Sequence, residues 1–237
     1  MVFGGKSFTR VVLATTLLGA GMVTPRVQAQ EVVITCLSFP KRTPASIELL
    51  VGPGKTVPIN LQSHTLTDPL KVPRLAVWKF GKSGTNAAGE FRFKSYGQVR
   101  PGTARKQLLL FVHKGASPSD GLNILALNDD KTAFGASQML FVNLAREPVA
   151  GLVGGKQFRL DSGKHIIIKP KADRGKNLCF ASLKYLRANK WRTFFSTNWP
   201  TLTTARGLVF LYNDPGSRSV KIHSVVDSLV RVPPPGE

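Results

Sequence analysis

The side chains that usually carry catalysis or bind metals are few in this chain and lie far apart. The histidines occur singly, at His64, His113, His165 and His223. Gly81-Lys82-Ser83 resembles the end of a phosphate-binding loop, but the first glycine of that motif is replaced here by Ala76. Neither a Gly-x-Ser-x-Gly nucleophile motif nor a His-Glu-x-x-His zinc motif occurs. The sequence therefore predicts a non-enzymatic protein with no metal and no cofactor; a hydrolase whose catalytic groups meet from distant strands is the alternative.

Residues 164–192 do carry a chemical pattern, in which basic side chains are interleaved with aromatic ones. Asp173 is the only acidic residue of this stretch, and Tyr185 and Trp191 lie within it. Its basic residues are Lys164, Lys169, Lys171, Arg174, Lys176, Lys184, Arg187, Lys190 and Arg192. Cations attract an anionic polymer over a long range, and exposed rings supply stacking. The stretch is predicted to bind a polyanion such as an acidic polysaccharide or another envelope polymer.

The alternation at the end of this stretch favours a second interpretation of its aromatic residues. In the segment WRTFFSTNW, a period of two places Trp191, Phe195 and Trp199 on one strand face, and Arg192 and Phe194 on the other. One apolar face is what the core of a β-sandwich requires. This pattern predicts that Trp191 is buried and that the cations form an ordinary solvated surface.

The start of the chain has the pattern of a secretory leader over residues 1–29. Lys6 and Arg10 precede the apolar run 11–23, and a small-residue cleavage site ends at Ala29. The run is shorter than the ~20 residues of a spanning helix, and no later segment is long and apolar enough to be one. We expect an exported, periplasmic or extracellular bacterial protein without a transmembrane segment. That location favours an envelope polymer as the ligand and argues against nucleic acid.

Composition indicates a basic, all-β protein. The chain carries 33 Lys and Arg against 13 Asp and Glu, and removal of Lys6, Arg10 and Arg26 with the leader leaves a formal charge of +17. Short β-branched and aromatic runs are broken by 22 Gly and 16 Pro. This pattern predicts two tandem immunoglobulin-like antiparallel sandwiches over residues 30–130 and 138–232, each of about seven strands, and a Pro-rich tail at 233–237. One large sandwich is the alternative, and no sequence repeat relates the halves.

The break between the halves contains the only adjacent acidic residues, Asp129 and Asp130. They are interpreted as a solvated linker, with a calcium site as the less favoured alternative. Cys36 and Cys179 are the only cysteines. In an oxidising compartment they are expected to form a disulfide between the halves, or else to remain as two buried thiols.

A run of predicted strands and tight turns begins near residue 141. The strand Phe141-Val142-Asn143 belongs to it, and Gly154-Gly155 and Gly163 are expected to form its turns. In this stretch of about thirty residues the chain resembles bacterial exported domains of unknown function with immunoglobulin-like folds. The resemblance implies an exported envelope or matrix module and carries no catalytic residues. The leading hypothesis is an exported protein that binds or organises cell-envelope components, through the basic surface or through an edge strand that pairs with a protein partner.

Overall fold

The computed structural model describes residues 30–39, 46–114, 120–213 and 219–229. The expected leader and the Pro-rich tail lie outside the described residues. The described part contains sixteen strands and no α-helix, which confirms the prediction of an all-β fold. It holds no helix with the length and hydropathy needed to cross a membrane.

The strands before residue 130 form two four-stranded sheets. The outer N-terminal sheet has the order β3-β2-β5-β6, and the inner N-terminal sheet has the order β4-β1-β7-β8. Their bounds are β1 Glu31–Phe39, β2 Ser46–Gly52, β3 Lys55–Asn60, β4 Leu70–Pro73, β5 Trp78–Thr85, β6 Phe91–Val99, β7 Lys106–His113 and β8 Leu122–Asn128.

The strands after residue 138 form two further sheets. The inner C-terminal sheet has the order β12-β9-β15-β16, and the outer C-terminal sheet has the order β11-β10-β13-β14. Their bounds are β9 Met139–Asn143, β10 Val149–Val153, β11 Lys156–Leu160, β12 His165–Ile168, β13 Leu178–Arg187, β14 Lys190–Pro200, β15 Ala205–Asn213 and β16 Val220–Ser228.

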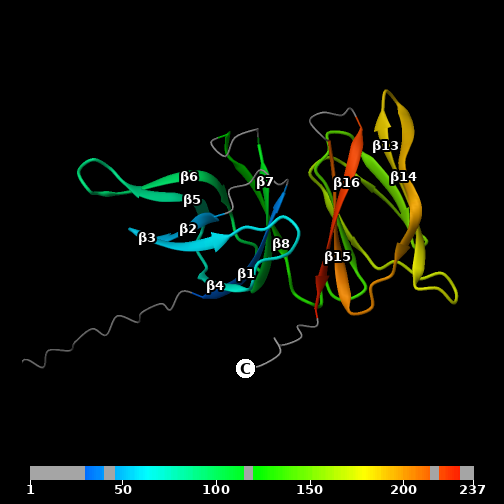
Figure 1. The fold of residues 1–237 in the computed structure, drawn as a ribbon, viewed down its shortest axis with the longest axis horizontal. Coiled ribbons are helices and arrows are strands. Elements are labelled where there is room, and N and C mark those ends of the chain that lie inside the picture. Colours follow the sequence, from blue (N-terminus) through cyan, green and yellow to red (C-terminus); the bar gives the residue numbers. More distant parts are fainter. Residues whose placement is uncertain (1–29, 40–45, 115–119, 214–218, 230–237) are drawn as a thin grey trace, which may run out of the picture.

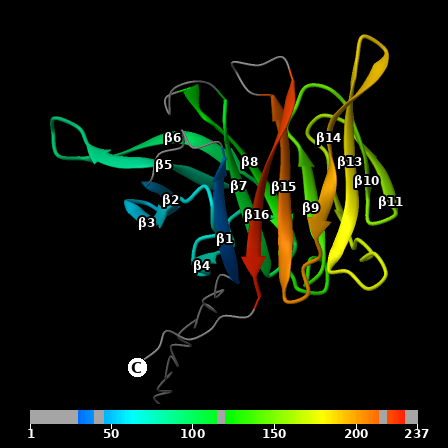
Figure 2. The same ribbon diagram turned by 45° about the vertical axis from the view of Figure 1, so that its right-hand side comes forward.

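The four sheets are stacked as layers, with one apolar core between each neighbouring pair (Figures 1 and 2). Trp78 and Phe80 belong to the N-terminal core, and Phe141 to the C-terminal core. The inner core joins the halves, since it combines Leu108 and Leu110 of β7 with Phe210 of β15. The two outer sheets therefore lie at opposite ends of the stack.

The second half repeats the strand order of the first. Adding eight to each strand number converts β4-β1-β7-β8 into β12-β9-β15-β16, and β3-β2-β5-β6 into β11-β10-β13-β14. Among the described residues each half has eight strands, one more than expected. In each half the first and seventh strands pair in parallel, β1 with β7 and β9 with β15. All other pairings are antiparallel. The halves thus share a topology that no sequence repeat reveals.

The Gly154-Gly155 turn shows how local chemistry sets this architecture. Val153 pairs with Lys156, so only two residues connect β10 and β11, and their φ angles are 52° and 75°. A two-residue turn of this kind requires positive φ at both positions, which glycine adopts without a Cβ clash. At Gly154 a Cβ would also lie 2.6 Å from the backbone nitrogen of Lys171.

The two cysteines do not form the predicted disulfide. Both are free and buried. Cys36 lies in the N-terminal core and Cys179 in the C-terminal core, on opposite sides of the inner core. Because each side chain is enclosed in its own core, the thiols cannot approach one another within the folded protein.

We expect reductant to leave the melting temperature unchanged, and both thiols to react with Ellman's reagent only after unfolding. Burial raises the pKa of Cys36 from its ordinary 9.0 to about 12, so the folded state holds the protonated thiol. The Cys36 thiol therefore leaves the free energy of unfolding unchanged with pH below about pH 9. Between about pH 9 and about pH 12 that free energy falls, because the thiol ionises in the unfolded protein but not in the folded one. A lower melting temperature in reductant would contradict the assignment.

The turn between β13 and β14 is strained at Ala188. Arg187 pairs with Lys190, and the two residues between them, Ala188 and Asn189, have φ angles of 49° and 56°. A left-handed conformation costs a residue with a Cβ about 1–2 kcal/mol. Ala188→Gly is therefore expected to raise the free energy of unfolding by roughly 0.5–1 kcal/mol, as measured by urea denaturation. The control is Ala150→Gly within β10, which should lower that free energy.

Candidate functional site

The outward face of the outer C-terminal sheet is built by strand alternation. Along β13 the side chains of Cys179, Ala181, Leu183 and Tyr185 point into the C-terminal core, and along β11 those of Phe158 and Leu160 do so. The residues between them therefore face away from the core. Lys184 and Arg159 are exposed on this side. We call this surface the outward face; its main residues are Arg159, Phe180, Ser182, Lys184, Trp191 and Asn198.

A β-bulge at Phe194 places Trp191 on the outward face. The pairing between β13 and β14 shifts so that Leu183 lies opposite Phe195 and Lys184 opposite Thr193, which leaves Phe194 without a partner in the register. A bulge inserts one residue and reverses the alternation beyond it. The Phe194 ring turns inward and lies 5.7 Å from Tyr185.

The prediction that Trp191 is buried is therefore wrong. Its side chain is 42% exposed, whereas Phe195 and Trp199 pack against the C-terminal core as expected. Trp191 lies opposite Leu186 in the register, near the free end of the β13–β14 hairpin. A large exposed ring on a sheet face is more informative than exposed small residues, because burying it would have stabilised the fold.

Arg159 lies over the exposed ring of Trp191. The distance from Arg159 Cζ to the ring centroid is 5.8 Å, within the range of a cation–π interaction. Arg159 Nε also lies 3.7 Å from Asp161 Oδ1, in an exposed ion pair. Arg159 precedes the basic stretch 164–192, so its role was not predicted. The signal was its place between Phe158 and Leu160, which fixes an outward position on β11.

Phe180 extends the aromatic character of this face along β13. It is 43% exposed and lies opposite Asn198 in the register. Leu186 and Phe180 are six residues apart, so the rings of Trp191 and Phe180 are separated by about 20 Å along the sheet. Lys184 and Ser182 occupy the outward positions between them. The outward face therefore combines two rings with a cation and hydroxyl groups over one continuous strand surface.

The nine predicted cations do not form one surface. Lys184 lies on the outward face, Arg187 and Lys190 flank the hairpin turn, and Arg192 follows Trp191 on β14. The others are in two connections: Lys164 just before β12, and Lys169, Lys171, Arg174 and Lys176 between β12 and β13. The hairpin turn and the connection from β12 are at opposite ends of β13 (Figures 1 and 2). The 10 residues of this strand separate its ends by about 30 Å.

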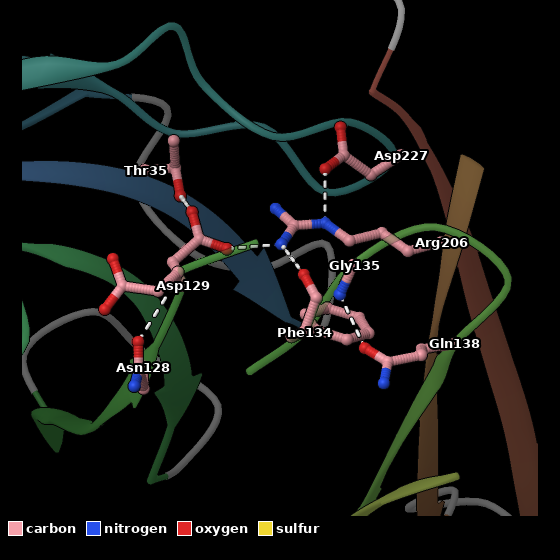
Figure 3. Close-up of polar contacts among 9 residues, drawn as sticks. Thr35, Asn128, Asp129, Phe134, Gly135, Gln138, Arg206 and Asp227 are labelled. Atoms are coloured by element: carbon pink, nitrogen blue, oxygen red, sulfur yellow. Dashed lines mark hydrogen bonds and ion pairs between the residues drawn. The ribbon is translucent and has the colours of Figure 1, made fainter. Parts of the chain in front are cut away.

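A second candidate is the polar cluster around Arg206 in β15, beside a cavity of about 780 Å³. Figure 3 shows the guanidinium between two carboxylates: Nη1 lies 2.6 Å from Asp129 Oδ1, and Nε donates to Asp227 Oδ2 at 2.8 Å. Nη1 also donates to the Phe134 carbonyl at 2.9 Å, and Thr35 Oγ1 donates to Asp129 Oδ2 at 3.0 Å. One guanidinium thus bridges both carboxylates, which suits a structural role rather than acid–base chemistry.

The interpretation of Asp129 as part of a solvated linker is wrong. The residue is buried and ion-paired, and it links the end of β8 to β15. His223 is likewise used in packing: its ring lies 5.1 Å from Phe39, and Nε2 is 3.1 Å from the Ser63 carbonyl oxygen. Across the described residues, no group of three or more His, Cys, Asp or Glu side chains is arranged to hold a metal ion.

Comparison with models of known protein families finds no match, and no curated protein matches the chain. The function is therefore inferred from the geometry of the outward face.

Proposed function

We propose that the protein is an exported, non-enzymatic module that binds an anionic polysaccharide of the cell envelope on its outward face. The observation that carries this proposal is the exposed ring of Trp191 with the guanidinium of Arg159 held over it at 5.8 Å. Folding does not require this arrangement, because no other sheet of the described residues covers this face. It suits a ligand that offers both an apolar surface and an anionic group.

The chemistry of an acidic sugar polymer matches the outward face group by group. The C–H face of a sugar ring stacks on an aromatic ring such as Trp191 or Phe180. A carboxylate or sulfate accepts paired hydrogen bonds from the guanidinium of Arg159 and a further one from Lys184. Hydroxyl groups pair with Ser182 and Asn198. Because the two rings are about 20 Å apart, the face has room for several sugar units of a linear polymer.

The charge of the chain supports the same ligand class. The formal net charge of +17 that remains without the leader raises the local concentration of an anionic polymer before any specific contact forms. Charge alone would attract any polyanion, whereas stacking on Trp191 adds selectivity for a ligand with flat apolar faces. An exported location makes a polysaccharide the appropriate polymer.

Edge pairing with a protein partner is less well supported than polysaccharide binding. β14 is the last strand of the outer C-terminal sheet and is 11 residues long, so its edge is a potential pairing surface. The bulge at Phe194 interrupts the straight run of backbone groups, and Lys190 and Arg192 add charge to this edge. Bulges and cations are features that discourage strand addition.

The test is retention of the purified protein on heparin and on uncharged dextran across a salt gradient. Arg159→Gln/Lys184→Gln removes two cations from the outward face, and Lys164→Gln/Lys176→Gln removes the same charge from connections elsewhere. The first variant should elute from heparin at clearly lower salt than the second. Equal elution of the two variants would show that retention reflects net charge only, and would overturn the proposal.

A further inference from the structure

The β5–β6 hairpin is the topological counterpart of the β13–β14 hairpin, and it repeats the exposed residues as well as the strands. β6 is the last strand of the outer N-terminal sheet, as β14 is of the outer C-terminal sheet. Trp191 and Arg192 have counterparts in Phe91 and Arg92, each 100 positions earlier. Phe91 is 40% exposed, against 42% for Trp191. A large ring is thus left open to solvent at the same place in both halves.

A bulge also fixes which way Phe91 faces. The pairing of β5 and β6 shifts between Phe80 and Gly81, so that Tyr96 has no partner in the register. Tyr96 packs against the N-terminal core, just as Phe194 packs against the C-terminal core. Successive side chains of a strand alternate between its two faces. Since Tyr96 faces the core, Phe93 and Phe91 lie on the side away from that core. The hairpin therefore presents Phe91 as the β13–β14 hairpin presents Trp191.

The β5–β6 hairpin is also basic. Its cations are Lys79, Lys82, Arg92 and Lys94. The two carboxylates on this surface are already engaged within the protein: Glu90 accepts from Asn86 Nδ2 at 2.8 Å, and Glu48 accepts from the Ser83 backbone nitrogen at 3.1 Å. The strand period places Arg92 and Lys94 on the opposite side of β6 from Phe91 and Phe93, and Lys79 on the same side as Phe91. The cations therefore lie on both sides of the hairpin, and together they give it a net positive charge that attracts an anionic ligand.

We propose that the β5–β6 hairpin is a second binding surface for the same anionic polysaccharide, so that one chain bridges two polymer strands. The proposal rests on the proposed function. The outer sheets are at opposite ends of the layered structure, and the β5–β6 hairpin projects away from the stack (Figure 1). One rigid ligand segment cannot lie on both hairpins, because the two inner sheets separate them. Bivalent binding of this kind gives cross-linking rather than tighter binding to one short segment.

The test combines stoichiometry with bridging. Isothermal titration with a short heparin fragment should give two sites per chain, and one site in either Phe91→Ala/Arg92→Gln or Trp191→Ala. Both variants should lose the clustering of heparin-coated beads that the unaltered protein causes. Phe91→Tyr keeps the ring and should keep both sites, and circular dichroism checks that each exposed-site variant is folded.

The outcomes separate the two proposals. One site per chain, lost in Trp191→Ala and unaffected by Phe91→Ala/Arg92→Gln, would overturn the second surface and leave the proposed function standing. Binding that neither variant changes would overturn both. Two sites that become one in each variant, together with loss of bead clustering, would support the bivalent arrangement.

Discussion

Trp191→Ala is expected to weaken binding of an anionic polysaccharide to the outward face by about tenfold or more, while the fold is retained. The side chain is 42% exposed and belongs to a face that no other sheet of the described part of the chain covers, so its removal opens no cavity in the core. Trp residues are among those whose truncation most often costs 2 kcal/mol or more at binding surfaces, and about 1.4 kcal/mol corresponds to a tenfold change in affinity. The variant also deprives Arg159 of the ring beneath its guanidinium.

The matched control for this variant is Val226→Ala. Val226 is an exposed apolar residue, 60% exposed, but it lies on β16 of the inner C-terminal sheet, away from the outward face. Titration calorimetry with heparin fragments should show a loss of affinity at the outward face for Trp191→Ala, none for Val226→Ala, and a smaller loss for Trp191→Phe, which keeps a ring. Unchanged affinity in Trp191→Ala would remove the main support for a polysaccharide site.

The bulge at Phe194 explains why the sequence pattern wrongly predicts a buried Trp191. A strict period of two along WRTFFSTNW groups Trp191 with Phe195 and Trp199, and only the latter two pack on the core. One extra residue reverses the alternation, and nothing in nine residues of strand-favouring sequence marks where it is inserted. The turns were easier to predict, because Gly154-Gly155 has few conformational alternatives.

The contact between Arg159 and Trp191 could not be predicted, because the two residues belong to strands that are far apart in the sequence. The period of a strand shows that Arg159 faces away from Phe158, but its contact with Trp191 depends on how four strands are ordered in the sheet. The cysteines illustrate the opposite error: an oxidising compartment favours a disulfide, but alternation directs Cys36 and Cys179 into separate cores. Composition predicts which residues are inside, and topology decides which core each one enters.

The two halves of the protein are joined through the inner core, and we call this contact between the two inner sheets the junction. Apolar residues from both inner sheets form this core, and the Arg206 cluster lies at its border, where β1 and the residues after β8 meet β15 and β16. If the two hairpins are to hold separate polymer strands, this junction must resist being pulled apart. The buried ion pair of Arg206 with Asp129 joins the two halves there, whereas Asp227 belongs to the same half as Arg206.

Arg206→Met is expected to lower the free energy of unfolding by about 3–5 kcal/mol, because it leaves Asp129 buried without its cation. The Arg206 side chain is 4% exposed and that of Asp129 is 9% exposed, so loss of the guanidinium leaves the Asp129 carboxylate largely buried without its cation. Methionine keeps much of the apolar packing on the Phe134 ring, which lies 4.5 Å from Arg206 Cζ. The loss therefore reports mainly on the ion pairs and on the hydrogen bond to the Phe134 carbonyl.

Arg92→Met is the matched control, because it breaks an ion pair with Glu90 whose partners are 3.7 Å apart and largely exposed. An exposed pair contributes at most about 1 kcal/mol, so urea denaturation should show a much smaller change for this variant. If Arg206 joins the halves, its variant should also unfold in two steps, with fluorescence of Trp78 in the first half and of Trp191 and Trp199 in the second reporting different midpoints. A single transition shifted by less than about 1 kcal/mol would mean that the inner core holds the halves together without Arg206.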